Sequence, residues 1–93
     1  MRDIDEIICR LSDAHPEISH EQRRVLHPGA DDDGLWFFRH PDCLYEVQLE
    51  ALNGQCPFLF ESEERHTPAT AGTVAEAFSM VAIGLGLAPP QPN

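Results

Sequence analysis

Three short stretches of the sequence carry residue types that could perform chemistry. The acids at 31–33 offer oxygen ligands of the kind that calcium prefers, and His40 with Cys43 has the spacing of half a zinc site. Glu46 and Glu61 could serve as a general acid and base if a fold placed them together. The question for each stretch is whether the rest of the sequence completes the site.

The sequence completes none of these three sites. A calcium loop of the EF-hand kind needs alternating ligands and a distant bidentate glutamate, which the stretch 31–33 lacks. A zinc site at His40 needs a second close pair, which His66 and the other cysteines do not supply. A catalytic carboxylate pair needs a deep cleft, which a small flat sheet does not offer. The sequence therefore predicts no metal, no cofactor and no enzymatic activity.

Two segments have the periodicity of amphipathic helices, residues 3–14 and residues 74–87. Their apolar stripes consist of Ile4, Ile7, Ile8 and Leu11 in the first and Val74, Ala77, Phe78, Val81 and Leu85 in the second. His15-Pro16 ends the first helix, because the residue before a proline is pushed out of the helical region. Gly84 lies near the second stripe, where a missing side chain permits close approach to a sheet.

The segment between these helices contains two hairpin signals. The first is the dipeptide 41–42, which has turn chemistry and joins strands 35–40 and 43–52. The second is the dipeptide 53–54, in a four-residue loop before a third strand that reaches Glu61. The predicted registers pair Phe38 with Tyr45, Trp36 with Val47, Leu49 with Phe58 and Val47 with Phe60. All these apolar side chains then share one face of the sheet.

Together these elements predict an α+β domain in which a three-stranded antiparallel meander is packed on one face by the N-terminal and C-terminal helices. Pro57 has no N–H to give to a neighbouring strand, which places the third strand at a sheet edge. A weaker helical segment is predicted at 19–26 from its capping-box spacing. We expect one domain over residues 1–87 and a proline-rich, disordered tail at 88–93.

The other side of the meander, called here the outer face, carries a mixture of large apolar and charged side chains. Its predicted members are Leu35, Phe37, Arg39, Glu46, Gln48, Glu50, Leu59 and Glu61. In one interpretation this is an ordinary half-buried sheet, and segment 19–26 covers Phe37 and Leu59. In the other it is a binding patch, because the predicted register sets Glu46 opposite Glu61 and like charges there destabilise a sheet.

The net charge limits the partners that such a patch would bind. Asp and Glu total 16 against 6 Lys and Arg, which gives a net charge of −10. This charge repels nucleic acid and anionic lipid and attracts basic proteins. The N-terminal residues MRDIDEIICRL lack the apolar core of a signal peptide or membrane span, which predicts a cytoplasmic location. The 3 cysteines are then expected to be free thiols.

Small size, strong acidity, the absence of an enzyme motif and the helix–meander–helix layout resemble the immunity proteins of bacterial toxin systems. The resemblance is one of class and extends over the whole chain. It implies a compact protein that neutralises a basic toxin domain by covering it. Acidic secretion chaperones are also similar, although they are usually longer and have further strands.

Three functional hypotheses follow from the sequence. The first is an acidic inhibitor or immunity-type protein that binds a basic partner through the outer face. The second is a homo-oligomeric adaptor or chaperone-like module that uses Met80, Ile83 and Leu87 on the last helix. The third is a small metal-dependent or thiol-dependent enzyme. A secreted toxin encoded nearby, a concentration-dependent mass and bound zinc would distinguish these hypotheses in turn.

Overall fold

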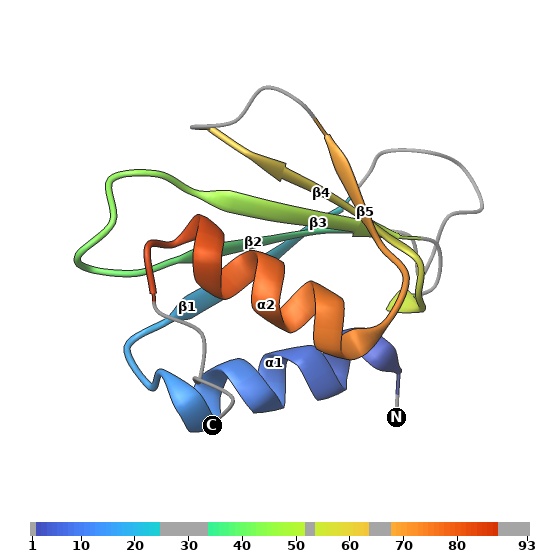
Figure 1. The fold of residues 1–93 in the computed structure, drawn as a ribbon, viewed down its shortest axis with the longest axis horizontal. Helices are drawn as coiled ribbons and strands as arrows, with labels where there is room; N and C mark the ends of the chain where they lie inside the picture. The colour runs from blue at the N-terminus through green and yellow to red at the C-terminus, as the bar shows by residue number, and fades with distance from the viewer. Residues whose placement is uncertain (1, 25–33, 52–53, 64–67, 88–93) are drawn as a thin grey trace.

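The computed structural model describes residues 2–24, 34–51, 54–63 and 68–87. These residues form, in chain order, α1 (Asp3–Ala14), β1 (Ser19–Arg24), β2 (Gly34–Arg39), β3 (Val47–Ala51), β4 (Phe58–Ser62), β5 (Ala69–Ala71) and α2 (Val74–Gly84). The strands make one antiparallel sheet in the order β1-β2-β3-β4-β5. Both helices lie on one side of that sheet (Figure 1). The predicted α+β class with an antiparallel sheet is confirmed.

The predicted number of strands is wrong, because the described residues form a sheet of five strands and not of three. The predicted meander corresponds to β2, β3 and β4, and a further strand pairs at each side of it. Residues 19–24 form β1 where a helical segment was expected, since pairing with the free edge of β2 outweighs a local capping signal. Strand β4 is not an edge strand, because it pairs with β5. Pro57 precedes β4 and therefore removes no ladder bond.

The registers of both hairpins differ from the predicted ones by two residues. Phe38 lies opposite Val47 and Leu49 lies opposite Phe60. The expected turn forms, with the Cys43 N–H bonded to the His40 carbonyl at 3.0 Å, but β3 does not begin until Val47. Because a shift of two residues preserves the face of every side chain within a strand, the predicted inner and outer faces remain correct for the residues of β2, β3 and β4.

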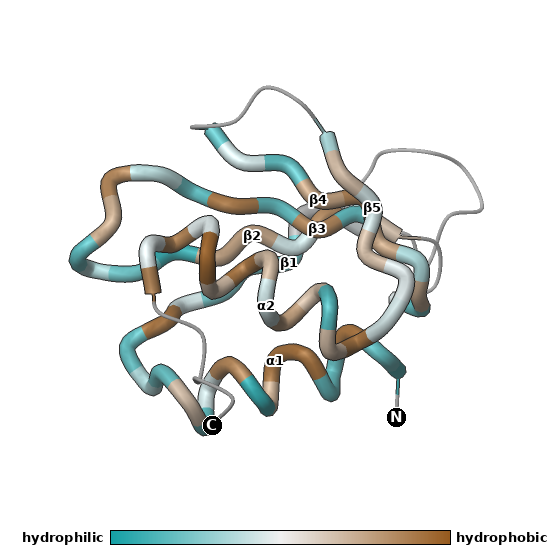
Figure 2. Tube along the Cα trace, in the orientation of Figure 1, coloured by the Kyte–Doolittle hydropathy of each residue, from teal (hydrophilic) through white to brown (hydrophobic). Residues whose placement is uncertain are grey.

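The core lies between the inner face of the sheet and the two helices. Its buried members include Ile4, Ile7, Leu11, Trp36, Phe38, Val47, Leu49, Phe58, Phe60, Ala77 and Val81. Figure 2 shows apolar residues gathered along the strands and along both helices. Ile8 and Phe78 pack against this core but are only partly buried. Tyr45, predicted to be in the core, lies in the connection before β3 and is 42% exposed.

Helix α2 ends three residues earlier than predicted, at Gly84. The Gly86 N–H bonds to the Ile83 carbonyl at 2.9 Å, and the Leu87 N–H bonds to the Ala82 carbonyl at 2.9 Å. These two hydrogen bonds form a Schellman motif, which requires a residue with a left-handed backbone conformation just past the helix. Gly86 supplies that conformation, with a φ of 76°.

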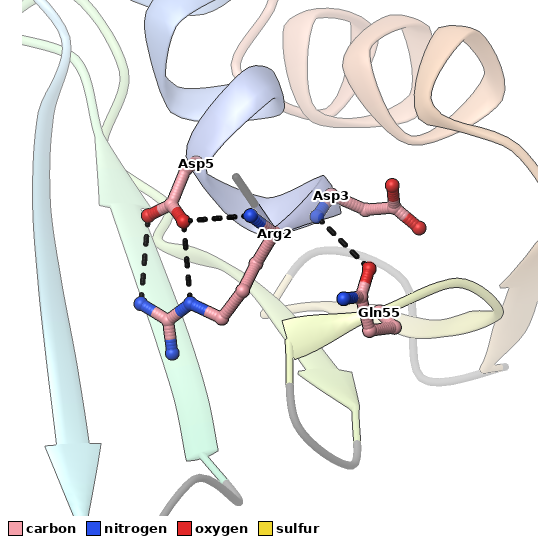
Figure 3. Close-up of polar contacts among 4 residues, drawn as sticks. All are labelled: Arg2, Asp3, Asp5 and Gln55. Carbon is pink, nitrogen blue, oxygen red and sulfur yellow. Dashed lines mark hydrogen bonds and ion pairs between the residues drawn. The ribbon is translucent and has the colours of Figure 1, made fainter.

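The N-terminus of α1 is tied to the loop before β4 (Figure 3). The Asp3 N–H donates to Oε1 of Gln55 at 3.2 Å, and the Cys56 N–H donates to Oδ2 of Asp3 at 2.9 Å. Oδ2 of Asp5 accepts from the backbone N–H of Arg2 at 3.0 Å and from its Nε at 3.2 Å. These bonds to Arg2 lower the pKa of the Asp5 carboxyl. The contacts anchor the first helix against the sheet.

Candidate outer-face interaction site

Strands β2, β3 and β4 bring the predicted outer-face residues together. Across these strands, Leu35 lies opposite Glu50, Phe37 opposite Gln48, Gln48 opposite Glu61, and Glu50 opposite Leu59. Along each strand these positions alternate with the buried core positions. Arg39 ends β2, and Glu46 immediately precedes β3. The sequence therefore identified which side chains share this face, although not which of them are direct neighbours.

The predicted pairing of Glu46 with Glu61 is wrong. Gln48 lies opposite Glu61, and Glu46 instead accepts a hydrogen bond from Nε of Arg39 at 2.8 Å. The side chain of Glu46 is only 10% exposed, whereas that of Arg39 is 66% exposed. The bond to Glu46 raises the pKa of Arg39. Glu46 is thus half of an ion pair, and it does not lie directly opposite Glu61 as the predicted register required.

Glu63 is an acidic neighbour of this face that the sequence did not identify. It follows β4, and its Oε2 accepts the backbone N–H of Glu46 at 3.3 Å. The Glu63 N–H in turn donates to the Glu46 carbonyl at 3.3 Å. The two-residue register shift makes Glu63, and not Glu61, the cross-strand neighbour of Glu46.

The outer face contains a hollow of about 190 Å³ near the start of β3 and the end of β4. Its lining consists of Phe37, Glu46, Gln48, Glu61, Ser62 and Glu63. An aromatic side chain surrounded by carboxylates can accommodate a cationic side chain, through ion pairing and through contact with the ring. The hollow combines both features on one surface.

Segment 19–26 was considered as a cover for Phe37 and Leu59. In the structure, residues 19–24 lie within the sheet, paired edge to edge with β2, and do not pack over the outer face. Residues 25 and 26 are outside the described residues. Phe37 and Leu59 are each half-buried. This interpretation of the apolar residues is therefore wrong for the strand itself.

The predicted half zinc site lies in a second hollow, of about 330 Å³, between the start of β1 and the connection from β2 to β3. Nδ1 of His40 accepts the Asp42 N–H at 3.0 Å, and Nε2 lies 3.8 Å from a carboxylate oxygen of Glu17. The Cys43 thiol contacts the backbone of Tyr45 at 3.4 Å. Residues 31–33 and His66 are outside the described residues, and the described ones contain no group of three or more His, Cys, Asp or Glu that could hold a metal ion.

The three cysteines are free and differ in their accessibility: Cys9 is exposed, whereas Cys43 and Cys56 are partly buried. Burial, together with the nearby Asp3 carboxylate, raises the pKa of the Cys56 thiol to about 11.

Alkylation should therefore modify Cys9 first and Cys56 last. At pH 8 a thiol with a pKa of about 11 is only about one-thousandth thiolate, and the thiolate is the reactive form. Raising the pH toward 11 should accelerate modification of Cys56. Timed iodoacetamide labelling with peptide mapping measures this order. Labelling of Cys56 at pH 8 as fast as that of Cys9 would contradict the described environment of Cys56.

The alternative surface on the last helix is smaller than predicted. Met80 and Leu87 pack against the core, which leaves Ile83, at 59% exposed, as the accessible apolar residue of that set. Across the described ranges, neither helix combines the length and apolar character needed to cross a membrane. Comparison of the chain with known protein families, curated proteins and solved structures returned no match.

Proposed function

We propose that the protein is a non-enzymatic binding protein that covers a basic protein partner with its outer face, as an inhibitor or immunity protein does. The observation that carries the proposal is the acidic hollow beside half-buried apolar side chains, on the side of the sheet opposite to both helices. The charges of such a surface accelerate association with a partner, and its apolar area slows dissociation.

The sign of the charge on this surface supports a basic partner. Arg39 balances the charge of Glu46, so that Glu50, Glu61 and Glu63 give the region around the hollow its net negative charge. Acidic side chains that surround an interface accelerate the association of a basic partner and disfavour acidic partners. The overall net charge of −10 acts in the same direction at longer range.

The apolar side chains of the outer face favour a protein as the binding partner over small cations. Leu35 and Phe37 lie on β2 and Leu59 lies on β4, within the same surface, and each is half-buried. Partly exposed apolar groups within a polar rim are typical of the anchors of protein interfaces. Loss of such an anchor mainly accelerates dissociation, because apolar contacts form after encounter.

The test begins with capture of binding proteins from a lysate of the source organism, followed by surface plasmon resonance against the captured basic protein. Glu50→Lys should slow association by about tenfold at low salt and by less at high salt. Glu50 is better suited to this test than Glu46 because it is exposed and forms no ion pair with the described residues, whereas Glu46 is bonded to Arg39. Leu59→Ala should leave the association rate unchanged and accelerate dissociation.

Asp13→Lys provides the matched control, because it makes the same change in net charge at an exposed position on α1, away from the outer face. Circular dichroism checks that each variant is folded. If Asp13→Lys slows association as much as Glu50→Lys does, only net charge matters and the outer face is not the site. If Glu50→Lys and Leu59→Ala both leave the association and dissociation rates unchanged, the proposal is likewise wrong.

A further inference from the structure

His40 is the one histidine among the described residues that is buried, with 8% of its surface exposed. It follows β2 directly and begins the connection from β2 to β3, residues 40–46. Nδ1 of its ring accepts the Asp42 N–H at 3.0 Å, and its backbone carbonyl accepts the Cys43 N–H at 3.0 Å. These two hydrogen bonds close the turn at the start of the connection.

The bond from Asp42 determines which ring nitrogen of His40 carries hydrogen. A backbone N–H can only donate, so Nδ1 must present a lone pair. In the neutral ring the hydrogen therefore lies on Nε2, the atom that is 3.8 Å from a carboxylate oxygen of Glu17. The arrangement resembles an Asx-turn, in which an Asn or Asp side chain accepts the N–H two residues further along the chain.

Protonation of Nδ1 is incompatible with this turn. Two N–H donors would then face each other across 3.0 Å, so the Asp42 N–H must lose its acceptor. At the other nitrogen, the positive charge of the ring strengthens its attraction to the Glu17 carboxylate, because ion pairing adds to the hydrogen bond. Histidine is the side chain whose charge ordinarily changes between about pH 5 and pH 8.

The elements beside the ring contribute several other titratable or charged groups. These are His15 between α1 and β1, His20 in β1, Arg39 in β2, and Asp42, Cys43 and Tyr45 in the connection itself. The Arg39 side chain pairs with Glu46, and neither helix has a basic residue in its last turn. Among the described residues, Glu17 is the one carboxylate that pairs with the His40 ring.

We propose that His40 is a pH-sensitive switch of the connection between β2 and β3. The neutral ring closes the turn through the Asp42 N–H. The protonated ring releases Asp42 and pairs with Glu17, in the segment before β1. The switch thus exchanges a bond within the connection for a bond to another segment, and it displaces a connection that presents the exposed Leu44 and ends at Glu46.

The first test follows the full, isotopically labelled chain by nuclear magnetic resonance between about pH 8 and pH 5. Spectra of the imidazole should show hydrogen on Nε2 alone at the upper pH and on both nitrogens at the lower pH. The Asp42 amide signal should move with the same midpoint as the ring signals, because this N–H loses its acceptor when the ring gains its proton.

His40→Asn is the matched variant, because its side-chain oxygen can accept the Asp42 N–H throughout this pH range. Its Asp42 amide signal should stay in place where that of the wild type moves, and the comparison also accounts for titration of the Asp42 carboxyl itself. Glu17→Gln removes the charge that favours the protonated ring, so the change should occur at a pH lower by about half a unit. Circular dichroism checks that both variants are folded.

The consequence for partner binding rests on the proposed function. Glu46 lines the hollow of the outer face, so displacement of the connection disturbs that surface. Acidification should therefore raise the dissociation constant of the captured basic protein by about fivefold more for the wild type than for His40→Asn. The spectra use the free protein, so failure to capture any partner would count against the proposed function and not against the switch.

Three results would overturn the switch. The first is hydrogen on Nδ1 of the neutral ring. The second is a ring that remains neutral throughout the titration. The third is an Asp42 amide signal that moves equally in the wild type and in His40→Asn. An equal effect of acidification on partner binding by these two proteins would overturn the link between the switch and the outer face.

Discussion

Replacing Phe58 by alanine is expected to lower the free energy of unfolding by about 3–5 kcal/mol. Phe58 is fully buried at the start of β4, opposite Ala71 of β5 and beneath the helical layer. Truncation removes most of an aromatic side chain from a close-packed core and leaves a cavity that surrounding strands can fill only in part. Urea denaturation monitored by circular dichroism measures the loss.

The neighbouring residue provides a control for Phe58→Ala. Leu59 lies in the same strand but on the outer face, where it is half-buried. Leu59→Ala should cost clearly less than Phe58→Ala, because its side chain has less burial to lose. Equal losses for the two variants, or a loss below about 1 kcal/mol for Phe58→Ala, would mean that the faces of β4 are not as described.

Side-chain alternation predicted the faces of the central strands but not their registers. Trp36, Phe38, Leu49 and Phe60 are all on the buried face, as their spacing indicates. Side-chain periodicity excludes only registers that are shifted by an odd number of residues. The choice among the remaining registers depends on the length and turn type of the loop. The loop preceding Val47 is longer than the turn at residues 41–42 suggests, so that Tyr45 lies outside the ladder.

The two edge strands could not be predicted from hydrophobic patterning, because they have little of it. Residues 19–24, SHEQRR, contain no large apolar side chain, and β5 consists of three small residues. What makes these segments strands is the presence of an unpaired neighbour, β2 or β4, whose backbone groups they satisfy. A tertiary requirement of this kind leaves no local signal in the sequence.

The composition of the candidate site was predictable, but its internal pairing was not. Every predicted outer-face residue lies at that face or beside it. The Arg39–Glu46 ion pair joins the end of β2 to the residue before β3. The loop between these strands is longer than expected, and its length determines which side chains lie opposite each other. Glu63 joins the site for the same reason, since the register shift brings it beside Glu46. On a surface that mixes acidic and basic side chains, the strand register thus determines which charges neutralise each other and which stay available to a partner.

Gly84 provides the second large expected effect, because the fit of α2 on the sheet depends on its missing side chain. A Cβ at this position would lie 2.8 Å from Cγ1 of Val47 and 2.9 Å from Cζ of Phe60. Both neighbours belong to the packed core and cannot move aside freely. Leucine is a better helix former than glycine by about 1 kcal/mol, so helix propensity alone would predict a gain for Gly84→Leu. We expect instead a net loss of about 3 kcal/mol, at the upper end of overpacking costs, because α2 must rise from β3 and β4 to admit the side chain.

Ala75→Leu is the matched control for Gly84→Leu, since it adds a leucine to an exposed position on the same helix and should change stability by less than about 0.5 kcal/mol. Gly84→Ala should fall between the two variants. If denaturant titration shows Gly84→Leu to be as stable as the wild type, α2 does not contact Val47 and Phe60 closely. Because Val47 and Phe60 adjoin Gln48 and Glu61 in β3 and β4, we expect displacement of α2 also to disturb the acidic hollow and to weaken partner binding.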